Sequence, residues 1–146
     1  MNVDNNLEIK TPPKKVWTTL IDFKKTHIWV KEKIEITPLN KLPPRKSFRF
    51  KVYVYRSLIT LKYLGEILEF DPYKEMKVLL KGGISKDSDM TIQFQLSDLD
   101  KKTKFNYKIE MEEKGLMSLV APFSDSLGDM GAETYFTNFK ELAEKT

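Results

Sequence analysis

Few residue types in this chain could do chemistry. The sequence has no cysteine and one histidine, His27, so thiol nucleophiles, disulfides, cysteine-ligated zinc and paired catalytic histidines are excluded. Acid–base chemistry would therefore rest on carboxylates, lysines or tyrosines. Asp87, Asp89 and Asp98 fall in or beside expected turns, where hydrogen bonding to the local backbone favours aspartate. No motif predicts converging metal ligands, and we expect no metal and no cofactor.

The tyrosines are the remaining polar groups that could act inside the protein. Tyr63, Tyr107 and Tyr135 are expected to point inward, and a buried hydroxyl can orient a ligand in an apolar pocket. Glu69 follows a suspected bulge and could face either way. The strand alternation turns the other charged side chains outward, namely Lys51, Lys62, Glu66, Lys77, Lys108 and Glu110. Because proton transfer needs a titrating group within reach of the substrate, their outward placement favours binding over catalysis.

The elements that position these tyrosines are strands with a period of two. Phe48, Phe50, Val52 and Val54 alternate with polar residues, and the same alternation predicts strands over 59–70, 75–83, 90–97 and 105–112. Gly65 indicates a bulge or bend in the first of these. Residues 3–10 and 33–39 predict two further strands, with two short helices over 14–22 and 23–30 between them. Tight turns between successive strands indicate an antiparallel meander.

A long helix is expected within the last thirty residues, 115–144, from Pro122 in its first turn to Glu144. Its polar residues recur at steps of three and four, which leaves one broad face to be buried against the sheet. Gly128 and Gly131 lie on that face, where core side chains normally fill space. Either a bulge or an aromatic side chain of the sheet fills the room that they leave, or a ligand does, and the sequence does not separate the two.

The whole chain predicts one domain over residues 1–146. Its net charge of +4 comes from 25 basic and 21 acidic residues, so nucleic-acid binding is not expected, and weak attraction to an anionic membrane surface stays open as an alternative. The first ten residues lack the apolar core of a signal peptide and no run is long enough to span a membrane, so we expect a cytoplasmic protein.

Several motifs resemble those of the START-like (SRPBCC) superfamily, which includes polyketide cyclases and the birch pollen allergen. The opening IKTPPKKVWTTLIDF is similar to that superfamily's first strand, proline pair and helix. EILEFDPYKEMKVLLKGG and TKFNYKIEMEEKGLMSLV are similar to its middle strands and to its last strand with the entry to the final helix. The aromatic residues within 135–139 resemble most the CoxG-like branch, whose members are associated with carbon monoxide dehydrogenase.

The resemblance implies an α+β helix-grip fold. In this fold a curved antiparallel sheet of six to seven strands wraps around a long C-terminal helix, and two short helices lie between the first two strands. The resemblance also implies a binding or transport protein for a hydrophobic small molecule, such as a lipid, an isoprenoid or a polycyclic aromatic. The residues expected to line its cavity are Trp29, Phe50, Val52, Tyr63, Met76, Val78, Met90, Ile92, Phe94, Phe105, Tyr107, Phe123, Leu127, Gly128, Gly131 and Tyr135.

Two alternatives stay open. The first is a polyketide cyclase or aromatase-like enzyme that uses a tyrosine or Glu69 as acid or base. The second is an accessory protein that docks to a larger enzyme complex or to a membrane surface through apolar residues off the core face. Those residues are Tyr53, Tyr55, Leu58 and Leu64, and a homodimer would use the same patch.

Overall fold

The computed structural model describes residues 2–83, 89–111 and 129–145. The predicted order of elements is confirmed in these residues. The elements are β1 (Asn2–Ile9), α1 (Pro13–Ile21), the 3₁₀ turn η1 (Phe23–Lys25), α2 (Thr26–Val30), β2 (Lys33–Pro38), β3 (Arg49–Tyr55), β4 (Thr60–Asp71), β5 (Glu75–Gly83), β6 (Met90–Asp98), β7 (Thr103–Met111) and α4 (Asp129–Lys145).

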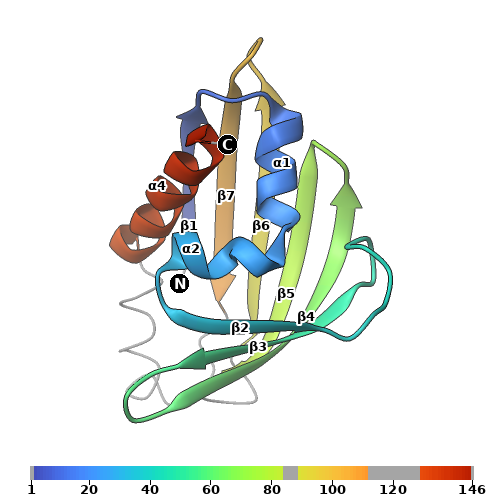
Figure 1. Ribbon diagram of the computed structural model, residues 1–146, viewed down its shortest axis with the longest axis vertical. Helices are drawn as coiled ribbons and strands as arrows, with labels where there is room; N and C mark the ends of the chain where they lie inside the picture. Colours follow the sequence, from blue (N-terminus) through green and yellow to red (C-terminus); the bar gives the residue numbers. More distant parts are fainter. Residues whose placement is uncertain (1, 84–88, 112–128, 146) are drawn as a thin grey trace.

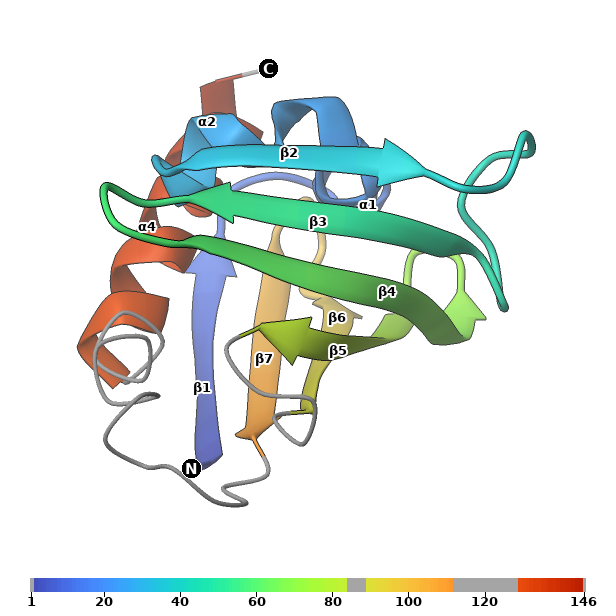
Figure 2. The same ribbon diagram turned by 90° about the horizontal axis from the view of Figure 1, so that it is seen from below.

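The strands form one antiparallel seven-stranded sheet in the order β1-β7-β6-β5-β4-β3-β2. The chain runs as a meander from β2 to β7, and β1 pairs along the outer edge of β7. The helices lie together on one face of this sheet (Figure 1). Seen from below, β2, β3 and β4 run across the direction of β1 and β7, so the sheet curves around the helices (Figure 2). This is the helix-grip arrangement.

The strand β4 departs from regular pairing at one point. Its register against β5 shifts between Ile67 and Glu69, which confirms the predicted bulge. Gly65, just before it, is buried and is paired with Phe50 of β3. The Phe50 ring lies so close to Gly65 that a Cβ atom there would collide with it. Glycine is therefore needed at position 65 for the ring to lie flat against the inner face of β4.

The helix α4 buries one face against α1, α2 and β1. Its fully covered residues are Ala132, Phe136, Phe139 and Ala143, whereas Glu133 is exposed, as the three-and-four spacing of the sequence predicts. The first part of the expected helix, residues 122–128, lies outside the described residues. None of the described helices is long and apolar enough to cross a membrane.

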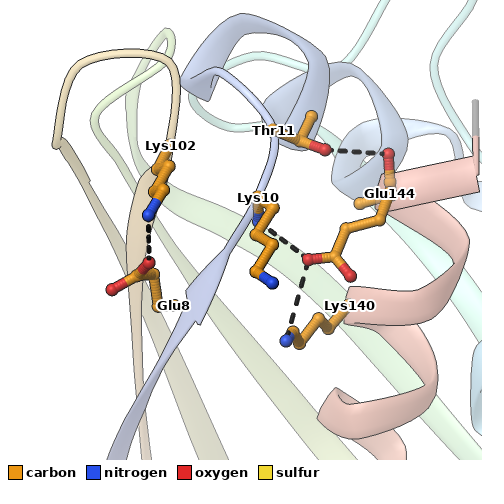
Figure 3. A network of polar contacts seen from close by, with 7 residues as sticks. Glu8, Lys10, Thr11, Lys102, Lys140 and Glu144 are labelled. Atoms are coloured by element: carbon orange, nitrogen blue, oxygen red, sulfur yellow. Dashed lines mark hydrogen bonds and ion pairs between the residues drawn. The ribbon is translucent and has the colours of Figure 1, made fainter.

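The last turn of α4 is fastened to the segment that joins β1 to α1 (Figure 3). A Glu144 carboxylate oxygen accepts a hydrogen bond of 2.8 Å from the backbone N–H of Lys10. The Thr11 hydroxyl donates to the carbonyl of Ala143 at 3.3 Å, and the buried Thr103 hydroxyl of β7 donates to the Thr11 carbonyl at 2.7 Å. The C-terminal end of α4 is thereby held against both β1 and β7.

Candidate functional site

An apolar cavity lies between the concave face of the sheet and the helices. Its volume is about 170 Å³. Alternate residues of β2, β3, β5 and β6 face it, because side chains two apart on a strand share one face of the sheet, and β4 and β7 contribute one residue each. Its lining residues are Leu20, Phe23, Thr26, Trp29, Val30, Glu32, Ile34, Ile36, Phe50, Val52, Val54, Tyr63, Met76, Val78, Leu80, Met90, Ile92, Phe94, Ile109, Tyr135 and Phe136.

Most of the residues predicted to line a cavity are brought together at this one. Those at the lining are Trp29, Phe50, Val52, Tyr63, Met76, Val78, Met90, Ile92, Phe94 and Tyr135. Phe105 and Tyr107 are buried in the core but do not line the cavity, because Phe136 covers them. The ring centroid of Phe136 lies 5.7 Å from that of Phe105 and 4.1 Å from that of Tyr107. Phe123, Leu127 and Gly128 lie outside the described residues, and of Gly131 the structure describes only its place in α4.

The structure adds lining residues that the sequence analysis missed. They are Leu20, Phe23, Thr26, Val30, Glu32, Ile34, Ile36, Val54, Leu80, Ile109 and Phe136. Several of these carried a usable signal, since Ile34 and Ile36 alternate within the predicted strand over 33–39 and Val54 continues the face of Phe50 and Val52. Glu32 had no such signal in the sequence, because it belongs to no periodic element. It lies in the loop after α2, next to Lys31, whose φ of 57° ends that helix in a left-handed conformation.

One corner of the cavity is polar, and we call Glu32, Arg56, Tyr63 and Tyr135 the polar corner. The Tyr135 hydroxyl donates a hydrogen bond of 3.0 Å to Oε2 of Glu32. The guanidinium of Arg56, at the β3–β4 turn, donates to Oε1 of Glu32 at 2.9 Å. Three segments that are distant in the sequence therefore meet at one carboxylate: the loop after α2, the β3–β4 turn and α4.

The two tyrosines of the polar corner keep their protons well above neutral pH. Burial is the main cause that raises the pKa of Tyr63 and of Tyr135 above the ordinary value of 10.0. The neighbouring Glu32 carboxylate raises both pKa values further, and the positive charge of Arg56 opposes it. Both hydroxyls are therefore neutral groups that can donate hydrogen bonds, and neither is a base at neutral pH.

The sequence argument that no titrating group faces the cavity needs correction. Glu32 lines it, from a loop that strand alternation does not describe. Glu69, which the sequence left open, is exposed beside the bulge of β4 and does not line the cavity. Of the residues named for the enzyme alternative, Glu69 therefore does not reach the cavity, whereas the tyrosines Tyr63 and Tyr135 line it.

Trp29 places a second kind of polar group at the lining. The structure puts it in α2, where its ring is 8% exposed and packs against Phe136 and Phe139 with centroids at 5.5 and 5.3 Å. Its indole Nε1 is buried and has no hydrogen-bond partner among the described residues. A buried donor left without an acceptor is costly, so this N–H is a group that would gain from an acceptor. Across the described residues, no three His, Asp or Glu side chains gather as metal ligands would.

Comparison with known proteins identifies the fold. No family model and no curated protein matches the sequence. Protein CV1439 from Chromobacterium violaceum matches in structure with a TM-score of 0.75 at 14% identity, covering 98% of this chain and 96% of that chain. Ara h 8.0201 matches with a TM-score of 0.75 at 13% identity, covering 100% and 99%.

An enzyme is also among the structural neighbours. The Zhui aromatase/cyclase from Streptomyces sp. R1128 matches with a TM-score of 0.72 at 12% identity, covering 99% of this chain and 94% of that chain. Together these matches confirm the helix-grip fold that the START-like resemblance implied. They do not single out the CoxG-like branch. At these low sequence identities the matches show the fold and nothing about function.

Proposed function

We propose that this protein binds a small hydrophobic molecule in the cavity between its sheet and its helices. One observation supports this most: the cavity is lined almost wholly by apolar side chains, and its polar groups include a cluster at one corner. Small-molecule sites in proteins commonly have this composition, with an apolar lining and a few placed polar groups that fix the orientation of the ligand.

The volume of the cavity restricts the size of the ligand. A cavity of about 150 Å³ holds one benzene ring in another protein, and drug-sized ligands occupy roughly 300–1,000 Å³. At about 170 Å³, this cavity fits one or two fused rings, or a short isoprenoid. Of the ligand classes that the sequence predicted, a compact aromatic or isoprenoid is therefore favoured over a long-chain lipid.

The polar corner supports binding over catalysis. Both oxygens of Glu32 already accept a hydrogen bond, one of them within an ion pair with Arg56. The carboxylate is thus held by the protein itself, and the two tyrosines keep their protons because burial raises their pKa values. Turnover of a polyketone that is lost in a Glu32→Gln variant would instead support the cyclase or aromatase alternative.

Filling the cavity tests the proposal. We expect native mass spectrometry of the purified protein to show a hydrophobic molecule at a one-to-one ratio, and solvent extraction to identify it. Val78 is buried at the lining of the cavity in β5, so Val78→Phe should expel the ligand. Leu79→Phe adds a similar ring on the opposite face of β5 and should leave binding unchanged. Equal occupancy in wild type and Val78→Phe would contradict the proposal.

A second candidate function is docking to an anionic membrane surface through the β3–β4 hairpin. Leu58 at its tip is 97% exposed and the adjacent Ile59 is 46% exposed. Two lysines lie over tyrosine rings of β3. The Nζ atom of Lys33 in β2 is 5.8 Å from the ring centroid of Tyr55, and that of Lys62 in β4 is 6.0 Å from the ring centroid of Tyr53. Exposed apolar residues flanked by lysines suit a surface that carries both acyl chains and negative headgroups. Failure to co-sediment with anionic vesicles would exclude this candidate.

A further inference from the structure

Glu32 offers unused hydrogen-bonding capacity to the cavity. It is the one charged residue among the described residues that line it. Its two oxygens accept one hydrogen bond each, from Arg56 at 2.9 Å and from Tyr135 at 3.0 Å. An ionised carboxylate has about four lone-pair sites, so about two remain available. The other lining side chains are mostly apolar, so a ligand with a hydrogen-bond donor gains most by placing it at this carboxylate.

The charge of the polar corner is already balanced. The Glu32 carboxylate and the Arg56 guanidinium form an ion pair whose side chains are about three-quarters buried, with exposed fractions of 28% and 24%. A third charge brought into the cavity would lose its hydration without a free counterion. An anionic ligand would in addition be repelled by Glu32, which lines the cavity, whereas Arg56 does not. The balance favours a neutral ligand.

A hydroxyl matches the polar groups of the lining better than an ether or a ketone does. The Glu32 carboxylate can only accept a hydrogen bond, so it pairs with a donor. The indole N–H of Trp29, which has no partner among the described residues, can only donate and pairs with an acceptor. A hydroxyl can donate and accept, but an ether or ketone oxygen can only accept. The hydroxyl is thus the smallest neutral group that can serve Glu32.

We propose that the cavity selects a compact, uncharged alcohol or phenol of one or two rings, whose hydroxyl donates its hydrogen bond to Glu32. This inference rests on the proposed function, because it names the ligand class of the same cavity. Long-chain carboxylates and neutral hydrocarbons without a hydroxyl are then poorer ligands, the former because of charge and length and the latter because they form no hydrogen bond with Glu32.

Three probes of one ring system test the proposal. They are 2-naphthol, which can donate, 2-methoxynaphthalene, which can only accept, and 2-naphthoate, which is anionic. In calorimetric titrations of the full chain at neutral pH, we expect 2-naphthol to bind about tenfold or more tightly than 2-methoxynaphthalene, since a lost hydrogen bond to a charged group typically has an effect of this size. Binding of 2-naphthoate should be weaker still.

A single substitution should reverse the charge preference. Glu32→Gln removes the carboxylate that pairs with Arg56 and that repels an anion in the cavity. We expect 2-naphthoate to bind about tenfold more tightly to this variant than to the wild type, and 2-naphthol to bind more weakly. Glu66→Gln is the matched control, because Glu66 pairs with Arg49 at the same 2.9 Å but does not line the cavity. It should leave all three affinities unchanged.

The outcomes distinguish this inference from the proposed function. Equal binding of 2-naphthol and 2-methoxynaphthalene would overturn the selection of a hydroxyl and would leave the cavity as a hydrophobic binding site. If folded wild-type protein, checked by circular dichroism, bound none of the three probes, both the proposed function and this inference would be overturned. Should Glu32→Gln unfold, Glu32→Asp decides instead: its shorter carboxylate should weaken 2-naphthol binding and still exclude 2-naphthoate, and unchanged 2-naphthol binding would overturn the inference.

Discussion

Tyr63 and Tyr135 differ from the other tyrosines of the chain in their position at the buried polar corner. Tyr63 is 5% exposed, and its ring packs on Gly83, where a Cβ atom would lie 2.9 Å from the ring. Gly83 also has a φ of 87°, which glycine adopts without strain. Tyr135 is fixed by its hydrogen bond to Glu32. The Tyr135 proton is thus committed to Glu32, and both rings are held in place at the lining of the cavity.

Alkaline titration should detect the buried tyrosines of the polar corner. The chain has six tyrosines, and burial first and the Glu32 carboxylate next raise the pKa values of Tyr63 and Tyr135. Ultraviolet absorbance of the folded protein should therefore show ionisation above pH 10 that Tyr63→Phe and Tyr135→Phe each reduce. An unchanged ionisation above pH 10 in Tyr135→Phe would contradict this assignment.

The same pKa shifts make the stability of the protein depend on pH in a defined direction. Because both folded-state pKa values lie above the unfolded value of 10.0, the folded protein holds protons that the unfolded chain releases. The contribution of these tyrosines to the free energy of unfolding is fully present below about pH 10 and is lost as the pH rises through the folded-state values.

The helix α4 closes the cavity on the side opposite the sheet, and aromatic packing holds it there. Phe139 is fully buried, with ring centroids 5.1 Å from Phe105 and 5.3 Å from Trp29. Phe136, one turn earlier, stacks on Tyr107 and also lines the cavity. The contacts of Phe139 thus hold α4 against the sheet and α2, while Phe136 forms part of the lining.

Removing the Phe139 ring should destabilise the protein without changing the lining of the cavity directly. We expect Phe139→Ala to lower the free energy of unfolding by about 3–5 kcal/mol, because a buried ring is replaced by a void. Urea denaturation would measure this. Thr137→Ala, at an exposed position of the same helix, should change the free energy by about 0.5 kcal/mol or less. A loss below about 1 kcal/mol in Phe139→Ala would show that α4 is held by other contacts.

Over the whole molecule, the β3–β4 hairpin connects the cavity with the exposed surface. The concave face of the sheet and the helices enclose the cavity, and the β3–β4 hairpin projects at the lower edge of the molecule in Figure 1. The turn of this hairpin carries Arg56, which belongs to the polar corner, and Leu58, which is almost fully exposed. A contact at the hairpin tip is therefore only a few residues from the ion pair at the cavity.

Membrane docking should depend on the hairpin and on salt. We expect the protein to co-sediment with vesicles that contain phosphatidylserine, less with phosphatidylcholine alone, and less again at high salt, because lysine contacts with headgroups are screened. Replacing both Leu58 and Ile59 by serine should abolish the binding. Leu99→Ser, at an exposed position beside the β6–β7 turn, should not change it. Unchanged binding of the double variant would exclude the hairpin as the contact.

Local periodicity in the sequence was enough to specify the elements and much of the lining. The alternation of Phe50, Val52 and Val54 predicts a strand and its buried face, and the spacing of Phe136 and Phe139 assigns them to one side of a helix. A meander of such strands with one long apolar-faced helix leaves few arrangements, so the fold could be predicted from these patterns.

The place of the polar corner and the size of the cavity depend instead on tertiary packing. Glu32 belongs to no repeating pattern, and it reaches the cavity because the loop after α2, the β3–β4 turn and α4 converge on it. Periodicity likewise assigned Phe105 and Tyr107 to the inner face, but only packing shows that Phe136 lies over them. The cavity volume of about 170 Å³ is the small space that remains after the side chains of the sheet and the helices have packed together. Its size depends on contacts between residues that are far apart in the chain.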